Sequence, residues 1–176
     1  MRRLTAAALA LALTTLLAPG CKHSRKARAK SSEDDGQLAS VVNVADPRVS
    51  VQLVRGFYNL EANTWRWTMG KFTVSLRPPA GAAQNGAKLE LKFNIPDVVF
   101  NQIGAITLTA AVNGLALPPE AYNKAGNFTY ARDVPGAALA GDAVAVDFAT
   151  DKVLPPSAQD SRELCLIVTS IGLAAK

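Results

Sequence analysis

Short runs of alternating apolar and polar residues dominate the chain from about residue 49 onward. The alternation is strict in Phe72–Arg77 and Leu89–Ile95, and much of Val49–Arg55 follows the same pattern. A period of two puts every second side chain on one face, which is typical of antiparallel strands with one face on a core. We expect further strands in four similar runs, at Ile106–Val112, Phe128–Arg132, Val144–Phe148 and Leu164–Leu173.

Glycine, asparagine and proline separate these runs. Asn113-Gly114 follows one predicted strand directly and is a strong signal for a hairpin turn. Proline pairs at positions 78–79, 118–119 and 155–156 predict loops. Helical periodicity is weak, and Asp97–Ile103 allows at most one or two turns. Residues 48–176 therefore predict an all-β domain, an antiparallel β-sandwich or jelly roll of about seven to nine strands.

The first 20 residues have the pattern of an export signal. Met1–Arg3 is a positively charged start, and Leu4–Ala18 is an apolar stretch that ends at Pro19-Gly20. This stretch is shorter than the roughly 20 residues that a transmembrane helix needs. The pattern predicts a signal peptide over residues 1–20, removed on export.

The residues around Cys21 sharpen this prediction. Leu16-Leu17-Ala18-Pro19-Gly20-Cys21 resembles the lipobox of bacterial lipoproteins, although Leu17 lies four residues before the cysteine instead of the usual three. The resemblance implies lipidation of Cys21 and a membrane-anchored location in the cell envelope. Lys22 in place of aspartate implies the outer membrane if the host has two membranes. The alternative is an ordinary secretory signal with an unrelated cysteine.

The net charge of +5 belongs mostly to the N-terminal segment. Residues 22–37 carry five positive and three negative side chains, whereas residues 38–176 carry 12 positive and 11 negative ones. A nucleic-acid-binding domain concentrates positive charge on its own surface, so this distribution argues against a nucleic-acid partner. We expect residues 21–47 to form a flexible tether, because most of this range lacks apolar periodicity.

The cysteine and histidine content limits the chemistry of the chain. Two cysteines are too few for a disulfide scaffold or a four-ligand zinc site. His23, the one histidine, falls in the predicted tether. Cys165 lies in an apolar run, where we expect a buried, inert thiol; a disulfide with Cys21 is the alternative. We therefore expect neither a metal site nor a cofactor.

The densest aromatic cluster lies between residues 56 and 68, which hold both tryptophans of the chain. In an extended strand, Trp65 and Trp67 point to one side and Arg66 to the other. One interpretation is a glycan-binding platform, because indoles are apolar rings with a polar edge and stack well on sugar rings.

Polar residues near the indoles suit this interpretation. Glu61, Asn63 and Arg66 would hydrogen-bond to sugar hydroxyls beside the two rings. The alternative is that one or both indoles cover the sandwich core, with Arg66 paired to Glu61 or Asp160 at its rim. Solvent exposure of the two rings distinguishes the alternatives, since fully buried rings cannot form a platform.

A second cluster, Asp160-Ser161-Arg162-Glu163-Leu164, precedes the last predicted strand. Asp160 and Arg162 alternate onto one side of an extended segment. An arginine–carboxylate pair has a fixed fork geometry, which predicts a structural clamp on a loop; recognition of a ligand carboxylate or hydroxyl is the alternative.

Evidence for catalysis is weak. Glu61 with Asp160, or Asp147 with Asp151, would be carboxylate pairs of the kind that cleave glycosides. A chain with 14 carboxylates offers such pairs by chance. The sequence contains no nucleophile elbow, phosphate-binding glycine loop or metal-ligand spacing. We therefore expect a protein that is not an enzyme and has no catalytic residues.

Taken together, several short motifs carry a family resemblance. The order Gly56-Phe57-Tyr58, Glu61, Trp65-Arg66-Trp67-Thr68 and Asp160-Ser161-Arg162-Glu163-Leu164 is similar to that of a jelly-roll-like accessory domain associated with bacterial surface-polysaccharide enzymes. The similarity covers about residues 50–175. It implies a β-sandwich with at most a glycan-associated role, and no established activity.

These observations lead to one expectation of function. We expect an exported, lipid-anchored, non-catalytic binding or accessory module at the cell envelope, with a glycan as its ligand. The alternative is a structural or protein-interaction module that docks an envelope protein through a sheet edge or an apolar face.

Overall fold

The computed structural model describes residues 38–176, so the predicted signal peptide, Cys21 and the first part of the tether lie outside the described residues. The strands are β1 (Val41–Asn43), β2 (Leu53–Glu61), β3 (Trp65–Leu76), β4 (Ala87–Ile95), β5 (Ile106–Val112), β6 (Leu115–Tyr122), β7 (Gly126–Val134), β8 (Val144–Thr150) and β9 (Ile167–Ala175). The helical segments are α1 (Ala82–Asn85), α2 (Asp97–Ile103) and the 3-10 turns η1 (Pro47–Gln52) and η2 (Gly136–Leu139).

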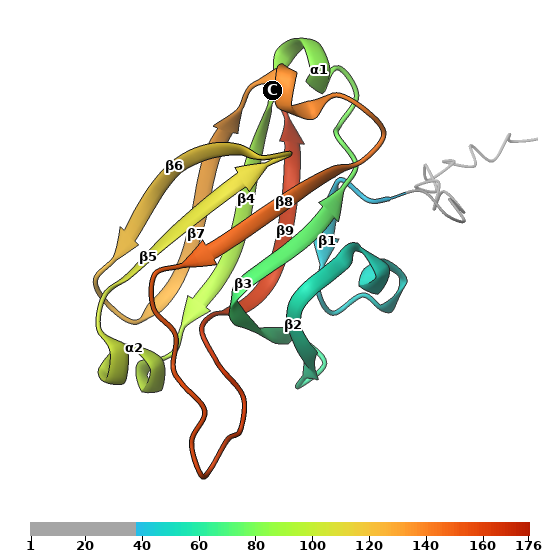
Figure 1. The fold of residues 1–176 in the computed structure, drawn as a ribbon. Helices are drawn as coiled ribbons and strands as arrows, with labels where there is room; N and C mark the ends of the chain where they lie inside the picture. The colour runs from blue at the N-terminus through green and yellow to red at the C-terminus, as the bar shows by residue number, and fades with distance from the viewer. Residues whose placement is uncertain (1–37) are drawn as a thin grey trace, which may run out of the picture. The chain divides into compact units, whose positions relative to one another are not determined.

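All pairings in the sheet are antiparallel, in the order β6-β5-β8-β3-β9-β4-β7, with β1 added to β9 and β2 to β3. The sheet folds over into two layers, with β5, β8 and β3 in front of β7, β4 and β9 (Figure 1). Strand β3 belongs to both layers: residues 71–76 pair with β8, whereas Arg66 and Trp67 pair with β9. The predicted all-β antiparallel sandwich is confirmed.

The core lies between the two layers and follows the alternation of the sequence. In β4 the buried residues are Leu89, Leu91, Phe93 and Ile95, and the intervening side chains point to solvent. In β8, Val144, Val146 and Phe148 are buried in the same way. Phe72 of β3 stacks on Phe148 with ring centres 4.9 Å apart, which joins the shared strand to the core.

The folded unit begins before the boundary that we predicted at residue 48. Val41–Asn43 pairs with β9, and Val42 is completely buried in the core. Gln52 holds this segment in place: its side-chain amide bonds to both the N–H and the carbonyl of Ala39 and to the carbonyl of Ser75. Part of the predicted tether therefore belongs to the sheet. A three-residue strand has too little alternation for sequence analysis to recognise.

The strand predicted at Val49–Arg55 is only partly correct. Pro47–Gln52 is a 3-10 turn, and the strand starts at Leu53. Asp46 accepts a hydrogen bond from the Arg48 N–H, and Pro47 occupies the first position of the turn, where a missing N–H costs little. These two capping residues override the alternation that follows them.

Strand β6 corrects the prediction of a loop at Pro118-Pro119. Both prolines lie within Leu115–Tyr122, at one end of the sheet order. An edge strand tolerates proline because one side of its backbone needs no ladder partner. The pairing with β5 shifts register between Leu108 and Ala110, opposite the prolines. The predicted hairpin turn at Asn113-Gly114 joins β5 to β6 as expected.

The helices are short. Strand β4 is followed by α2, whose seven residues agree with the predicted one or two turns. Among residues 38–176, no helix is both long and apolar enough to cross a membrane.

Candidate functional site

The candidate site is built on the hairpin formed by β2 and β3. Glu61 ends β2 and Trp65 begins β3, and the Thr64 N–H donates to the Glu61 carbonyl across the turn (3.0 Å). Ala62 and Asn63 both have positive φ, at 46° and 53°. Two successive left-handed residues match the twist of the flanking strands, so the hairpin closes tightly. Asn63 therefore lies exposed at the tip of the turn.

Strand register decides which side chains share a face. Glu61 lies directly opposite Trp65, and Arg66 lies opposite Val168, which is completely buried. Paired residues share a face, and successive residues alternate between faces. Trp65, Trp67 and Glu61 therefore lie on the outer face of the sheet, and Arg66 lies on the other.

Neither indole is fully buried. Both Trp65 and Trp67 keep part of their surface exposed, and Trp67 packs partly against the core. The Nε1–H of Trp65 is buried and has no hydrogen-bond partner among the described residues. The two rings are thus held by the fold but retain solvent-facing surface.

Arg66 interacts with the backbone. Its Nε donates to the carbonyl of Val44 and its Nη1 to the carbonyl of Tyr58, both at 3.0 Å. It therefore does not make the pair with Glu61 or Asp160 that the core interpretation expected. Its contacts hold β2 against the segment that follows β1.

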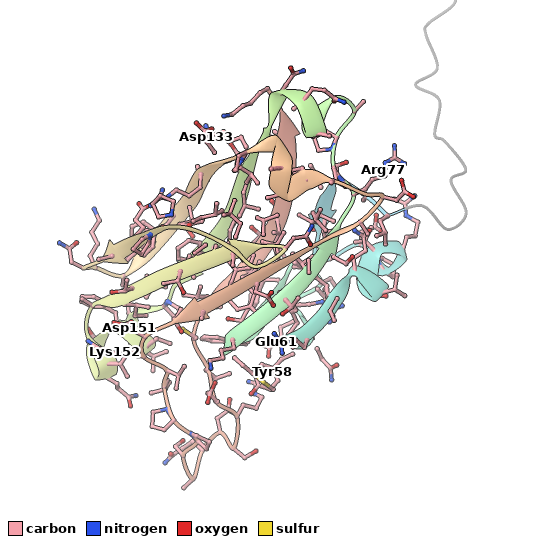
Figure 2. The ribbon with its side chains drawn as sticks, turned by 45° about the horizontal axis from the view of Figure 1, so that its top comes forward. Tyr58, Glu61, Arg77, Asp133, Asp151 and Lys152 are labelled. Carbon is pink, nitrogen blue, oxygen red and sulfur yellow. The ribbon has the colours of Figure 1, made fainter. Side chains whose placement is uncertain are left out.

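Arg162 makes that pair instead. Its Nη1 donates to Glu61 Oε1 (2.7 Å), while its Nε and Nη2 donate to the two carboxylate oxygens of Asp160 (3.0 and 2.8 Å). The guanidinium carbon lies 5.3 Å from the centre of the Tyr58 ring. The two residues that we predicted as a clamp are in contact, and Tyr58 and Glu61 lie at the same end of the sandwich (Figure 2).

The hydrogen bonds between Arg162 and Asp160 fix the charges of both groups. They lower the pKa of Asp160, and together with the bond to Glu61 they raise the pKa of Arg162. Both groups are ionised at neutral pH. We call the group of Tyr58, Glu61, Trp65, Trp67 and Arg162 the hairpin surface.

The segment that carries Arg162 is bonded to β3 just beyond the indoles. Glu163 accepts a hydrogen bond from the Gly70 N–H, and the Cys165 N–H donates to the Thr68 carbonyl. The Cys165 thiol is completely buried beside the Thr150 hydroxyl (3.2 Å). Burial raises its pKa to about 11, so the thiol is protonated at neutral pH, in agreement with the inert thiol we expected.

The other carboxylates considered for catalysis are engaged in structural contacts. Asp147 accepts hydrogen bonds from the Arg55 guanidinium and the Thr73 hydroxyl, and Asp151 accepts one from the Thr107 N–H. Within residues 38–176, no group of three or more His, Cys, Asp and Glu side chains is arranged to hold a metal ion.

Two parts of this region leave little local signal in the sequence. The contact between Tyr58 and Arg162 joins residues far apart in the chain, so the sequence shows Tyr58 only as a member of the aromatic cluster. The polar outer face of β4 was visible as Glu90, Lys92 and Asn94 in the alternating run. Its position on the same face as Trp67, with β9 between them, depends on the order of the strands, which alternation does not encode.

Comparison with known proteins yields similarity of structure alone. No protein-family model and no curated protein sequence matches the chain. A carbohydrate-binding module that recognises mannan aligns with 79% of this chain and 97% of its own, at 11% identity and a TM-score of 0.47. An exo-β-1,3-galactanase from Phanerochaete chrysosporium aligns with 79% of this chain and 27% of its own, at 13% identity and a TM-score of 0.36. The chain is similar to both in the course of its backbone.

Proposed function

We propose that this chain is an exported, lipid-anchored, non-catalytic module that binds glycan at the cell envelope through the hairpin surface. The observation that carries the proposal is the partial exposure of both indoles on one face of β3. An indole held by the fold but open on part of its surface is suited to stacking on the apolar face of a sugar ring.

The polar neighbours have distinct roles in this proposal. The Glu61 carboxylate accepts hydrogen bonds from sugar hydroxyls beside the rings, and the Asn63 side-chain amide both accepts and donates them. Arg66, which the sequence suggested as a ligand contact, positions the hairpin through its bonds to Val44 and Tyr58. Arg162 fixes the orientation of the Glu61 carboxylate.

The same contacts support a non-catalytic role. Glycoside cleavage needs one protonated carboxylic acid as general acid, usually with a raised pKa. The bonds from Arg162 lower the pKa of Asp160, which therefore stays ionised at neutral pH. Glu61, its nearest candidate partner, shares the same arginine.

Export and lipid anchoring rest on the sequence of residues 1–21. We expect the mature protein to begin at a lipid-modified Cys21 and to fractionate with membranes. Cys21→Ser should release it into the soluble fraction or leave the signal uncleaved. Mass spectrometry of the mature N-terminus tests this directly, and an unmodified cysteine at residue 21 would contradict it.

Tryptophan fluorescence tests glycan binding, because both tryptophans of the chain lie on the hairpin surface. The folded protein would be titrated with soluble neutral galactomannan, xyloglucan and mixed-linkage β-glucan. We expect at least one of them to shift the emission, and the single-tryptophan variants Trp65→Phe and Trp67→Phe should show which ring responds.

Affinity electrophoresis in gels containing the responding polysaccharide measures the loss in variants. Trp67→Ala should weaken binding about tenfold or more, equivalent to about 1.4 kcal/mol. Leu115→Ala, which removes an exposed apolar side chain on β6, is the matched control and should bind normally. If Trp67→Ala lowers the melting temperature by several degrees and binds unchanged, the indole belongs to the core and the proposal fails.

A further inference from the structure

A row of paired residues connects the hairpin surface to the far edge of the sheet. Trp67 of β3 is paired with Ile167 of β9, Ile167 with Asn94 of β4, and Asn94 with Asn127 of β7. Paired residues in adjacent strands point to the same face. These four side chains therefore form one row on the outer face. The row extends about 14 Å, because neighbouring strands lie about 4.8 Å apart.

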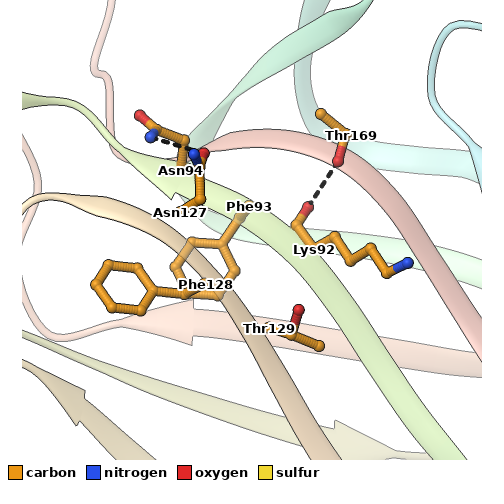
Figure 3. A pocket seen from close by; sticks show the side chains of 7 residues that line it. All are labelled: Lys92, Phe93, Asn94, Asn127, Phe128, Thr129 and Thr169. Carbon is orange, nitrogen blue, oxygen red and sulfur yellow. Dashed lines mark hydrogen bonds between the residues drawn. The ribbon is translucent and has the colours of Figure 1, made fainter.

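The far end of this row is hollowed. A shallow pocket of about 340 Å³ lies there, near the lower end of the range for small-molecule sites. Its lining consists of Lys92, Phe93, Asn94, Asn127, Phe128, Thr129 and Thr169 (Figure 3). Polar side chains on the outer face of three adjacent strands thus converge on one hollow.

A β-bulge in β9 contributes to the shape of the pocket. Lys92 pairs with Ser170, whereas the next residue, Phe93, pairs with Val168, so Thr169 is an extra residue in the ladder. The Thr169 hydroxyl donates to the Lys92 carbonyl (3.3 Å). A bulge bends its strand and redirects a side chain. Here it brings Thr169 to the rim of the hollow.

The lining has unused hydrogen-bonding capacity. Asn94 Nδ2 donates to Asn127 Oδ1 (2.9 Å), which aligns the two amides side by side. Within the described residues, the Asn94 carbonyl oxygen, the Asn127 amino group and the Thr129 hydroxyl make no other side-chain hydrogen bond, and the Asn127 and Thr129 side chains are exposed. Amide and hydroxyl groups both donate and accept, as sugar hydroxyls do.

The charge of the lining narrows the ligand class. Among the residues that the structure describes, no carboxylate lines the pocket, and Lys92 is the one charged side chain there. A cationic ligand would find no partner there, and a phosphate or sulfate would find a single lysine without the arginine fork that such groups favour. Neutral polyhydroxylated ligands match the amide and hydroxyl groups best.

We infer that the glycan-binding surface crosses the strands from Trp67 over β9 to Asn94 and Asn127, and that it takes an extended neutral oligosaccharide. This inference rests on the proposed function and adds a second contact region to it. Trp67 stacks on one sugar, Ile167 packs beneath the chain, and the paired amides hydrogen-bond a sugar further along. The ligand therefore runs across the strands.

Isothermal titration calorimetry with oligosaccharides of two lengths tests this. The probes are cellobiose and cellohexaose, mannobiose and mannohexaose, and xylobiose and xylohexaose. For a binding pair, Asn127→Ala and Thr129→Ala should each weaken the hexasaccharide about five- to tenfold, the range that one hydrogen bond supplies. They should leave the affinity for the disaccharide, which reaches only the indole, within twofold of wild type.

Matched variants separate the possible outcomes. Asn85→Ala removes an exposed asparagine in α1 and should change neither affinity. Trp67→Ala should weaken both lengths of sugar. If Asn127→Ala and Thr129→Ala bind the hexasaccharide like wild type while Trp67→Ala does not, the row does not contribute to binding. The hairpin surface would then be the whole glycan-binding site. If wild type binds none of the six sugars and none of the three polysaccharides, the proposed function and the inference fail together.

Discussion

The hairpin surface and the region where β6 meets β7 contain the same kinds of residue, but these residues have different roles in the two regions. At the β6–β7 seam, which we define as Glu120, Tyr122, Phe128, Tyr130 and Arg132, an arginine lies over an aromatic ring beside a carboxylate. The Arg132 guanidinium carbon is 4.4 Å from the centre of the Tyr130 ring, and Arg132 pairs with Glu120 at 2.8 Å.

The two regions differ in burial and in what the arginine binds. Tyr130 is completely buried, and Arg132 donates to the carbonyls of Pro118 and Pro119, which are part of the edge strand itself. Arg162 bonds to side-chain carboxylates and lies over the partly exposed Tyr58. The seam therefore closes the sandwich, whereas the hairpin surface leaves its rings accessible.

The largest effect should come from a ring next to the seam. Phe93 is 3% exposed and packs against Tyr122 and Phe128, with ring centres 5.1 and 5.8 Å away. Phe93→Ala should lower the free energy of unfolding by about 3–5 kcal/mol, since it removes a buried ring and leaves a cavity. Urea denaturation measures this. Trp65→Ala, at the half-exposed hairpin surface, should lower the free energy of unfolding clearly less. An equal loss would contradict the difference in burial between the two regions.

The two arginines provide a matched pair. Arg132→Met should destabilise the fold by about 1–2 kcal/mol, because the carbonyls of Pro118 and Pro119 lose charged donors and the buried Tyr130 ring loses the guanidinium that lies over it. Arg162→Met should cost under about 1 kcal/mol, because its carboxylate partners are solvent-accessible. Chemical denaturation and polysaccharide binding would be measured on both. Only Arg162→Met should weaken polysaccharide binding, and weakened binding for Arg132→Met alone would contradict the roles given to the two arginines.

Alkaline pH should act mainly on the seam. Burial raises the pKa of Tyr122 and Tyr130 above the usual value near 10. The native state then keeps protons that the unfolded chain releases, so stability is full below about pH 10 and falls above it. Tyr122→Phe should reduce this fall. The Tyr122 hydroxyl is buried without a hydrogen-bond partner among the described residues, so the variant should be at least as stable as wild type at pH 7.

The urea midpoints of wild type and Tyr122→Phe would be compared at pH 7 and at pH 10.5. Tyr130→Phe is the control, because it also loses the hydrogen bond to the Pro118 carbonyl and should be less stable at both pH values. A Tyr122→Phe protein that loses as much stability at pH 10.5 as wild type would show that Tyr122 does not control the alkaline response.

The smallest effect should be on the chemistry of Cys165, which lies three residues after Arg162 in the same segment. Its raised pKa and complete burial predict no reaction with a thiol reagent at pH 8 until the protein unfolds. The labelling rate in dilute urea therefore reports opening of this end of the sandwich. Rapid labelling without denaturant would mean that the segment behind the hairpin surface opens freely.

Alternation along the chain was enough to predict the layers. The pattern of Leu89–Ile95 placed four buried side chains of β4 correctly, and the turn at Asn113-Gly114 was correct as well. Local chemistry that competes with alternation was not predicted. Asp46 and Pro47 start a 3-10 turn where the alternation indicates a strand. Pro118-Pro119 lies in an edge strand, although a pair of prolines usually indicates a loop.

The candidate site was predicted less completely, because several of its contacts join residues that are far apart in the chain. Trp65 and Trp67 were placed on one face because they are neighbours in one strand. The links from Arg162 to Glu61, and from Trp67 across Ile167 to Asn94, join segments about 70 to 100 residues apart in the chain. Such links depend on strand order and on the bulge at Thr169, which a single sequence does not determine.

The most direct test follows the side-chain N–H groups by two-dimensional ¹H–¹⁵N NMR while the highest-affinity hexasaccharide is added. The Trp67 indole and the Asn127 amide resonances should shift together and saturate at the same sugar concentration, while the Asn85 amide resonance stays in place. Shifts confined to residues away from the outer face of β3, β9, β4 and β7 would contradict glycan binding along this row.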